Sequence, residues 1–437
     1  MFPTRKRYTT DMSNSLLTTQ KATLSPVLKQ ATPVVVDYGS GSWIYDTSGE
    51  KFLDFTTGIG VTSTGHCHPA VVAAAREQVG KIIHAQYTTV MHQSLLELTE
   101  KLGGVLPRGL DSVFYANSGS EAVEAAMRLA RMATGRPNII AFHGGFHGRT
   151  VAAASLTSAG TRFRSGFAPL MPGVHFAPFP YSVRYGWDEN TTVEFALKEL
   201  DYLLQTISSP ADTAAFIIEP VLGDGGYLPT PTAFLRGLRE RADRHGIVLI
   251  MDEVQTGVGR TGRFWGHQHA DVIPDVLVTA KGIASGFPIS AIAASAELMS
   301  KAWPGSQGGT YGGNAVSAAA AVATLNVIEE EGLVENARIM GDLLAQGLAD
   351  LGQDFDGISD TRGLGLMQAI EFATPDGAPD AVLAAAVQQG ALKHKLLTLG
   401  CGTQGNVLRI IPPLTVNREE IELGLKALRH TLEEVGA

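Results

Sequence analysis

Residues 246–286 read GIVLIMDEVQTGVGRTGRFWGHQHADVIPDVLVTAKGIASG and contain two short apolar runs, each followed by an ionisable residue. Residues 247–251 lead directly into Asp252, and residues 275–279 are followed, after one alanine, by Lys281. Both runs are rich in Val, Ile or Leu and bounded by Gly or Pro, which predicts buried strands. Ligands of open α/β sheets bind at the carboxyl ends of strands, so we expect a site there with one acid and one amine.

Pyridoxal phosphate is a cofactor that uses both groups, because a lysine forms its Schiff base and a carboxylate keeps its ring nitrogen protonated. The alternative is an unrelated pair of surface charges at two strand ends. Gly282 follows Lys281, which suits a sharp bend that presents an amine. Gln255 comes three residues after Asp252 and could reach a polar substituent of the same ring.

The composition excludes several classes of protein. A length of 437 residues favours two domains, and 44% hydrophobic with 18% charged residues indicates a globular chain. The net charge of −9 disfavours nucleic acid as the main partner. Two cysteines cannot form a disulfide framework, no apolar stretch has transmembrane length, and no apolar signal core follows the basic N-terminus. We therefore expect a soluble, cytoplasmic protein that binds neither nucleic acid nor membrane.

From residue 112 onward the chain repeats the order strand, turn, helix, which predicts an α/β fold with a mostly parallel sheet flanked by helices. Residues 34–55 alternate like paired strands, residues 1–30 indicate a poorly structured arm, and residues 56–69 a loop. The expected strands are 112–116, 138–142, 214–218, 366–372 and 407–411, and the expected helices are 70–79, 94–102, 121–134, 232–245, 314–331, 334–351, 378–394 and 418–435. The expected domains are an N-terminal arm with strands packing on the small domain (1–65), a large domain (66–325) and a small α+β domain (326–437).

Two turns rich in small residues follow expected strands. Residues 117–120 precede a helix whose first N–H groups could bind a phosphate, although Ser120 could equally be an ordinary helix cap. In residues 144–150 the glycines allow close backbone approach, and Phe146 could stack on a flat ring. Arg149 in that turn could bind a carboxylate, and the alternative is a flexible loop with a surface arginine.

Metal and nucleotide sites find little support. The histidines cluster at residues 66–68, at 143 with 147, and at 267 with 269, without a second pair at zinc-finger spacing. There is neither a Walker A sequence nor a dinucleotide fingerprint after a strand. We therefore expect no metal, ATP or NAD.

Taken together, these motifs resemble the class III, fold-type I pyridoxal-phosphate-dependent aminotransferases, from about residue 34 to the end. The pairing of DEVQ with AKG is the most specific part. The resemblance implies a large domain with a mostly parallel seven-stranded sheet flanked by helices, plus a smaller α+β domain. The motifs that carry it are GIGVTSTGHCHP (58–69), NSGSEAVEAAMRLAR (117–131), FHGRT (146–150), IIEP (217–220), MDEVQTGVGRTG (251–262), AKG (280–282), GGTYGGN (308–314), RGLGLM (362–367) and NVLRIIPPLT (406–415).

The resemblance also implies roles around the cofactor, pyridoxal 5'-phosphate. Lys281 and Asp252 are the implied catalytic residues: Lys281 forms the Schiff base and then moves the proton, and Asp252 pairs with the pyridinium nitrogen. Phe146 stacks on the ring, and Gly119 with Ser120 holds the phosphate. The further implied cofactor contacts are Ser118, His147, Glu219, Val254, Gln255 and Thr310. Thr310 would reach the neighbouring subunit's site, which implies a homodimer or a tetramer of two dimers.

Within that family the chain resembles 4-aminobutyrate and related ω-amino acid enzymes, with 2-oxoglutarate as amino acceptor and ping-pong kinetics. The implied substrate residues are Arg149 for the distal carboxylate, Arg409 for the α-carboxylate and Ile59 in the pocket loop. The chain departs from the family at Leu222 and Asp224, where Gln and Glu are usual. We hypothesise that Asp224 still pairs with Arg409 and masks it while an ω-amine reacts.

Other functions fit the same motifs. Ornithine and acetylornithine aminotransferases share much of the pattern. An amino acid racemase on this scaffold would use the same Lys281 and Asp252. A non-catalytic binding or structural protein is the third alternative, and the intact set of expected site residues argues against it.

Overall fold

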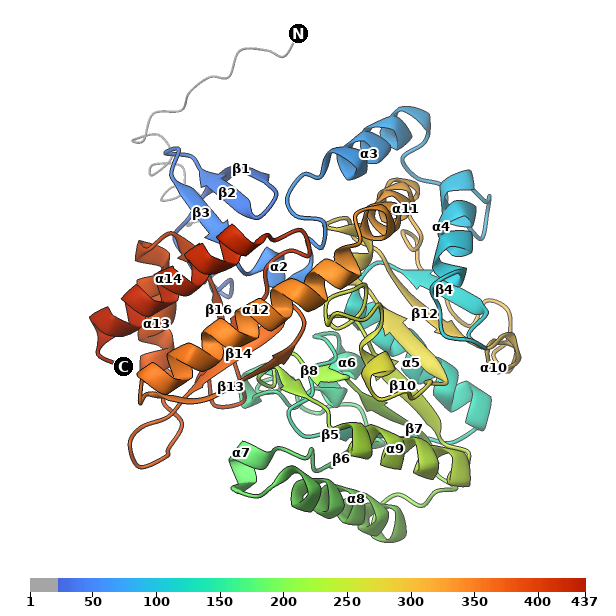
Figure 1. Ribbon diagram of the computed structural model, residues 1–437. Helices are drawn as coiled ribbons and strands as arrows, with labels where there is room; N and C mark the ends of the chain where they lie inside the picture. Colours follow the sequence, from blue (N-terminus) through green and yellow to red (C-terminus); the bar gives the residue numbers. More distant parts are fainter. Residues whose placement is uncertain (1–22) are drawn as a thin grey trace.

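The computed structural model describes residues 23–437 and contains a central sheet of seven strands (Figure 1). Strand β12 runs antiparallel to its two neighbours, and the other strands are parallel to one another, so the predicted mostly parallel sheet is confirmed. The arm expected at residues 1–30 lies mostly outside the described residues. In spatial order the strands are β4 (Ser112–Ala116), β12 (Ser290–Ala294), β11 (Val276–Thr279), β10 (Val248–Asp252), β7 (Thr213–Ile218), β5 (Asn138–Phe142) and β6 (Val174–Ala177).

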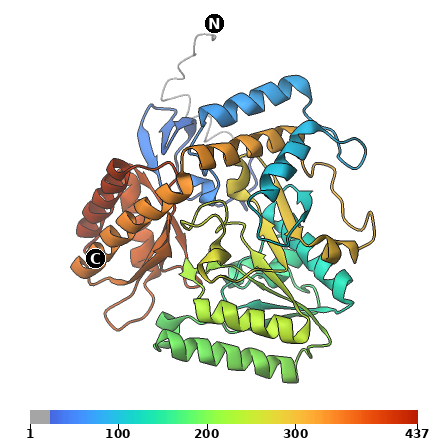
Figure 2. The ribbon, with the colours of Figure 1, turned by 45° about the vertical axis from the view of Figure 1, so that its right-hand side comes forward.

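Helices cover both faces of this sheet, because alternate strand residues point to opposite sides. Leu249 of β10 packs in a core cluster with α8 (Glu189–Thr206) and α9 (Thr232–His245). Its neighbour Val248 packs on the other face with α5 (Gly119–Thr134). Figures 1 and 2 both show α8 and α9 side by side along one edge of the molecule. Burial on both faces explains why the strands read as continuous apolar runs rather than alternating ones.

The two apolar runs of residues 246–286 form strands, as predicted, and the structure shows that these strands are parallel neighbours. Strands β10 and β11 pair in register with Asp252 opposite Val278. Asp252 is the last residue of β10, and Lys281 follows the end of β11 by two residues. Both ionisable groups are therefore delivered to the carboxyl edge of the sheet.

The C-terminal part of the chain builds a separate antiparallel sheet, in which Ala369 lies opposite Arg409. Its strands are β13 (Ile358–Leu364), β14 (Met367–Phe372), β17 (Val407–Ile410) and β16 (Leu399–Cys401), and its helices are α12 (Leu333–Asp354), α13 (Ala381–Lys393) and α14 (Arg418–Val435). Helix α11 (Ala315–Glu330) packs on α3 (Pro69–Lys81) and α4 (Gln93–Gly103) before the chain enters this region.

The N-terminal strands complete a third sheet with a segment from the other end of the chain. Its strands are β1 (Val36–Ser40), β2 (Trp43–Asp46), β3 (Lys51–Asp54) and β15 (Leu396–Leu397). Leu53 of β3 lies opposite Leu396, and Asp54 lies opposite Leu397. Figure 1 shows these blue strands next to the red C-terminal helices. The division of the chain at residues 65 and 325 stays a prediction.

Several elements have no counterpart among the predicted ones: strands β6, β12, β13, β15 and β16, and helix α8. In residues 56–69, expected as a loop, the structure has α2 (Thr57–Gly60), but Gly58 and Ile59 in it have left-handed φ of 62° and 73°, so it is no regular helix. The remaining elements are α6 (Val151–Leu156), α7 (Ser182–Tyr185), α10 (Ala296–Ser300), β8 (Val221–Leu222), β9 (Leu228–Pro229) and the 3-10 helices Thr161–Phe163, Gly266–His269 and Lys281–Ala284.

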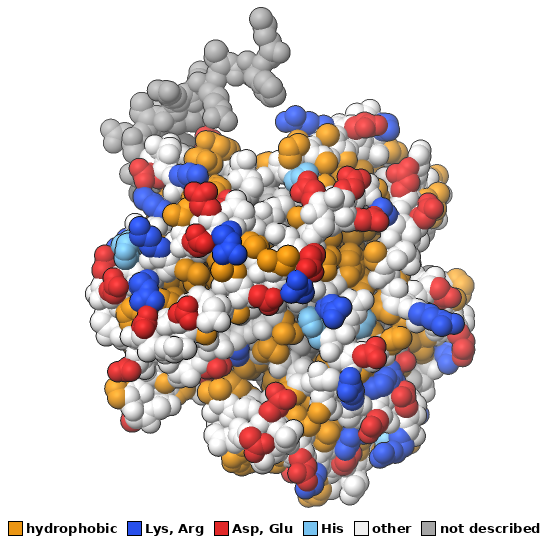
Figure 3. All heavy atoms as spheres, viewed as in Figure 1, with side chains coloured by type: hydrophobic (Ala, Val, Ile, Leu, Met, Phe, Trp, Pro, Cys, Tyr) orange, Lys and Arg blue, Asp and Glu red, His pale blue; other side chains and the backbone are white. Residues whose placement is uncertain are grey.

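The surface carries a mixture of charges. Figure 3 shows acidic and basic side chains interspersed over the face viewed, without a large region of one sign. Among the helices of residues 23–437, none combines the length and the apolar character needed to cross a membrane.

Candidate active site

A cavity of about 310 Å³ lies at the carboxyl edge of the central sheet. It gathers residues from the ends of β4, β7, β10 and β11 and from the loop after β5, so segments far apart in the sequence meet there. Most of the predicted site residues line it: Ser118, Gly119, Ser120, Phe146, His147, Glu219, Asp224, Asp252, Val254, Gln255 and Lys281.

Four predicted residues lie outside the lining of this cavity. Ile59 is 44% exposed, and Thr310 is also exposed. Arg149 is exposed, and its guanidinium carbon lies 4.8 Å from the centre of the Phe163 ring. Arg409 is buried and is connected to the cavity through Asp224. The implied substrate residues thus surround the cavity, whereas the implied cofactor residues of this chain, apart from Thr310, line it.

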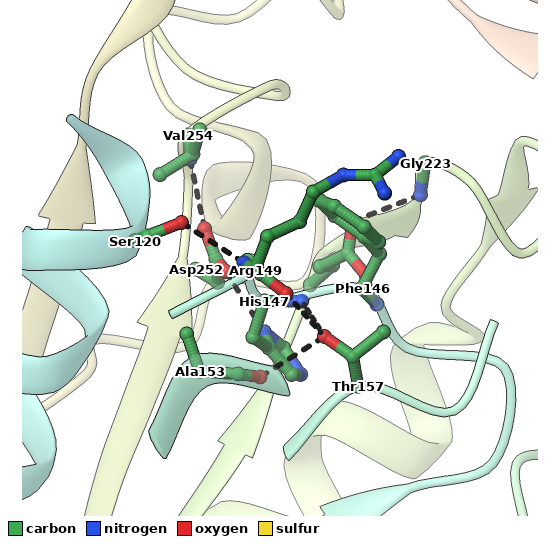
Figure 4. A network of polar contacts seen from close by, with 11 residues as sticks. Ser120, Phe146, His147, Arg149, Ala153, Thr157, Gly223, Asp252 and Val254 are labelled. Atoms are coloured by element: carbon green, nitrogen blue, oxygen red, sulfur yellow. Dashed lines mark hydrogen bonds and ion pairs between the residues drawn. The ribbon is translucent and has the colours of Figure 1, made fainter. Parts of the chain in front are cut away.

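Asp252 is held in place by two hydrogen bonds (Figure 4). Its Oδ2 accepts from Nδ1 of His147 at 2.8 Å, and its Oδ1 accepts from the backbone N–H of Val254 at 3.1 Å. Burial opposes a charge on His147, but the hydrogen bond and charge of Asp252, together with Glu219, outweigh it and raise the pKa of His147. The carboxylate is therefore fixed in orientation by His147 and by the backbone.

Lys281 presents its amine to the cavity from a left-handed backbone conformation, with φ of 48°. Such a φ is rare for a residue with a side chain and is typical of constrained functional positions. Burial lowers the pKa of Lys281, and the charge of Asp224 partly opposes this effect. A larger fraction of this amine than of a surface lysine is consequently neutral near pH 7 and able to act as nucleophile or base.

The turn before α5 corrects one expectation. Ser118, not Ser120, caps the helix: its Oγ accepts from Glu121 N–H at 3.3 Å, and the Glu121 carboxylate accepts from Ser118 N–H at 3.0 Å. Ser120 was the wrong choice because the helix begins two residues earlier than predicted. Its hydroxyl lines the cavity and accepts from Arg149 N–H at 3.1 Å. The first turn of α5 thus offers N–H groups and a hydroxyl to an anion.

Gly119, Phe146 and Gln255 shape the remaining lining of the cavity. A side chain at Gly119 would place its Cβ 3.0 Å from Val254, so the backbone there approaches closely only because residue 119 is glycine. Phe146 lies in the lining and meets Phe163 edge to face, with ring centres 5.0 Å apart. The Oε1 atom of Gln255 is buried and has no hydrogen-bond partner among the described residues. A flat aromatic ligand with a polar substituent fits such a lining.

Glu219 lies deeper, at the end of β7. Its carboxylate accepts from the backbone N–H groups of Phe146 at 2.8 Å and Gly223 at 2.9 Å. Burial raises the pKa of Glu219 to about 7, although the charge of His147 acts in the opposite direction. Glu219 therefore joins the loop after β5 to the hairpin that follows β7.

Asp224 and Arg409 are in contact, as hypothesised. Nη1 of Arg409 lies 3.5 Å from Oδ1 of Asp224, a loose ion pair rather than a short one. Arg409 comes from β17 in the C-terminal sheet, and Asp224 from the hairpin β8–β9. That this contact masks Arg409 during one half of a reaction stays a prediction.

Sequence reasoning did not assign a role to Glu253, the neighbour of Asp252. Glu253 is fully buried and accepts from Nδ1 of His267 at 2.8 Å and from the Gly266 N–H at 2.9 Å. Burial opposes its charge, but His267 outweighs this and lowers the pKa of Glu253. The sequence did contain a signal for Glu253, namely its place in the DEVQ motif directly after an apolar strand. A carboxylate at such a position is rarely buried without a partner, so a partner could have been expected.

The mostly parallel sheet brings a fixed carboxylate, a buried lysine and a helix N-terminus into one cavity, a combination that suits an enzyme site for a flat, anionic ligand. The Aminotransferase class-III family model matches residues 25–432. The 5-aminovalerate aminotransferase DavT of Pseudomonas putida is 38% identical over 97% of this chain and 99% of the relative. The 4-aminobutyrate aminotransferase GabT of Escherichia coli is 39% identical over 93% and 95%.

A solved structure of a PLP-bound amine transaminase from an uncultivated Pseudomonas species matches with a TM-score of 0.88 and 29% identity, over 94% of this chain and 98% of that chain. These matches agree with the resemblance drawn from the DEVQ and AKG motifs. The chain belongs to the class III aminotransferase family.

Proposed function

We propose that the chain binds pyridoxal 5'-phosphate and transfers the amino group of an ω-amino acid, such as 4-aminobutyrate or 5-aminovalerate, to 2-oxoglutarate. The observation that carries this proposal is the joint placement of Asp252 and Lys281 at neighbouring strand ends of one cavity. When bound, pyridoxal phosphate supplies an electron-withdrawing ring that stabilises negative charge on the substrate carbon.

In this proposal each lining residue has a defined task. Asp252, oriented by His147, holds a proton on the ring nitrogen. The first turn of α5 with Ser120 binds the phosphate. Phe146 covers one face of the ring, and Gln255 hydrogen-bonds a ring substituent. Lys281 would hold the cofactor and would move the proton at the substrate carbon as general base and acid.

The substrate class follows from the charges around the cavity. Arg149 at the exposed rim and Arg409 at the buried end offer two separate carboxylate positions. An ω-amino acid has one carboxylate, and 2-oxoglutarate has two, so the pair of arginines suits both half-reactions. The enzymes that are 38% and 39% identical to this chain are named for 5-aminovalerate and 4-aminobutyrate, which supports the same class.

The proposed assembly is a homodimer, in which Thr310 of each subunit contacts the phosphate of the other. The exposure of Thr310 outside its own cavity supports this arrangement. A cytoplasmic location stays a prediction.

An amino-donor panel tests the function. Purified protein reconstituted with pyridoxal phosphate is incubated with 2-oxoglutarate and 4-aminobutyrate, 5-aminovalerate, ornithine or acetylornithine, and glutamate formation is measured. We expect the two ω-amino acids to give the largest kcat/KM. Faster turnover of ornithine or acetylornithine would replace the proposed substrate. Loss of optical activity of a single amino acid enantiomer without any oxo acid would identify a racemase instead.

A further inference from the structure

Tyr227 is a buried residue for which the proposed reaction has, so far, no task. Its side chain is 0% exposed, and its hydroxyl has no hydrogen-bond partner of normal geometry within residues 23–437. Its backbone φ of 52° lies in the left-handed region, which is unusual for a bulky residue. A buried hydroxyl without a partner on a strained backbone calls for an explanation beyond packing.

The position of Tyr227 in the fold directs it to Arg409. Its ring packs in a small cluster that includes Val407 and Ile411. Residues 407 and 409 lie on the same face of β17, because side chains alternate along a strand. Tyr227 therefore contacts the face of β17 from which Arg409 projects. Tyr227 and Asp224 both act on the pKa of Arg409 and raise it against the opposing effect of burial.

The Arg409 end of the site leaves several polar groups without partners. Arg409 is 5% exposed, and its Nε and Nη1 atoms make no hydrogen bond in the described part of the chain. Its only ion-pair contact within residues 23–437 is the 3.5 Å approach of Nη1 to Asp224 Oδ1. Buried N–H groups without acceptors are costly, so this end of the site favours an anionic ligand.

The hairpin that carries Asp224 and Tyr227 is held rigidly. Gly402 N–H donates to the backbone oxygen of Asp224 at 2.9 Å, and Arg362 donates to that of Gly226 at 2.7 Å and 3.0 Å. The N–H of Tyr227 itself donates to Gly223 oxygen at 3.3 Å. The backbone that carries Tyr227 is therefore fixed from several sides.

We propose that the Tyr227 hydroxyl is a positioning element of the Arg409 carboxylate site: it holds the guanidinium in place for the α-carboxylate of the 2-oxo acid. Asp224, shorter than the glutamate usual in the family, reaches Arg409 only loosely. The unpaired Tyr227 hydroxyl is then free to become an uncharged second contact of the guanidinium when Asp224 swings away. This inference rests on the proposed function and adds a residue that discriminates between its two half-reactions.

The test compares wild-type holoenzyme with Tyr227→Phe, which removes only the hydroxyl. Tyr115→Phe is the matched control, because Tyr115 is also buried, its hydroxyl bonds Thr99 at 3.0 Å, and it packs in the main core. The KM for 2-oxoglutarate and the rate of the half-reaction with 4-aminobutyrate are measured. Binding of glutarate, a dicarboxylate that carries no amine or oxo group, is followed by calorimetry.

For Tyr227→Phe we expect the KM for 2-oxoglutarate and the Kd for glutarate to rise about tenfold, as for loss of one hydrogen bond to a charged group. The 4-aminobutyrate half-reaction should change less than about twofold, because the ω-amino acid has no α-carboxylate. Tyr115→Phe should leave all three quantities unchanged. Tyr227→Leu also lacks the hydroxyl and carries the same expectation should the Phe variant not fold.

Unchanged glutarate binding in Tyr227→Phe, or an equal effect on both half-reactions, overturns the inference, since a merely structural residue would act on both. Failure of wild-type protein to bind glutarate overturns it as well. If wild-type protein binds glutarate but does not react with 4-aminobutyrate, the proposed amino donor is wrong, and the glutarate Kd still decides the role of Tyr227.

Discussion

The two ends of the cavity differ in how their polar groups are satisfied. At the Asp252 end, carboxylates are already paired: Asp252 with His147, and Glu253 with His267, each at 2.8 Å. At the Arg409 end, the guanidinium has a single loose ion pair among the residues that the structure describes. The first end is built to keep one geometry, whereas the second is completed only by what binds there. In the proposed reaction the cofactor stays and the substrates alternate, which explains the difference.

Replacing the lysine should give the largest effect. We expect Lys281→Ala to lower kcat by roughly 10⁴-fold or more, because the base that moves the proton is gone. Glutamate formation and the absorbance of the bound cofactor report it. Lys301→Ala, at a half-exposed position after α10, is the control and should keep wild-type kcat. Comparable activity in both variants would remove Lys281 from the reaction.

Replacing Asp252 at the rigid end should have a smaller effect than replacing Lys281. Asp252→Asn should lower kcat by about 10³-fold, since a neutral amide no longer favours a proton on the ring nitrogen. It should also lower the pKa of His147, because the hydrogen bond and charge that raise it are lost. NMR titration of that imidazole checks the second point. Asp243→Asn, on the exposed side of α9, should change neither quantity.

Substitutions at the loosely paired end should change the preference between amino donors more than the overall rate. In Asp224→Ala the Arg409 guanidinium is unmasked, and we expect the ratio of kcat/KM for 4-aminobutyrate to that for L-alanine to fall about tenfold. Asp224→Glu, with the longer side chain usual in the family, should keep or increase this ratio. An unchanged ratio in Asp224→Ala means that Asp224 is no mask.

The smallest expected effect is the contribution of Glu219 to the pH dependence of the free energy of unfolding. Burial raises its pKa to about 7 from the model-peptide value of 4.5, so the folded apoprotein loses stability as pH rises through that interval. Glu219→Gln cannot ionise, and its free energy of unfolding should fall by about 1 kcal/mol less than that of wild type between pH 5 and pH 8. Urea unfolding at both pH values measures this. Equal falls in the two proteins would contradict a raised pKa.

Much of the rigid end was predictable because its signals are local. Strands that stop at Asp252 and near Lys281, and helices such as residues 232–245, follow from apolar runs and their boundaries in the sequence. Strand β12 was not predicted, although it lies between β4 and β11, since its residues SAIAA carry little pattern of their own. Its place is decided by the neighbours on which it pairs.

The loosely paired end was less predictable for the same reason. Arg409 and Asp224 could be named by resemblance, but the geometry between them depends on how the C-terminal sheet packs on the hairpin β8–β9. Tyr227 was missed because a tyrosine among glycines gives no sign that its hydroxyl will be buried next to an arginine. Ser118 and Ser120 were confused because both can cap a helix, and only the start of α5 distinguishes them.

The pairing of β3 with β15 limits when the N-terminal sheet can form during synthesis of the chain. Leu53 and Asp54 are made 343 residues before their partners Leu396 and Leu397 (396 − 53 = 343). This sheet therefore cannot close before residue 397 has been made, and β3 presents an unpaired edge until then. A chain that is cut short before residue 396 keeps that edge open for good, which marks it for aggregation or for removal by proteases.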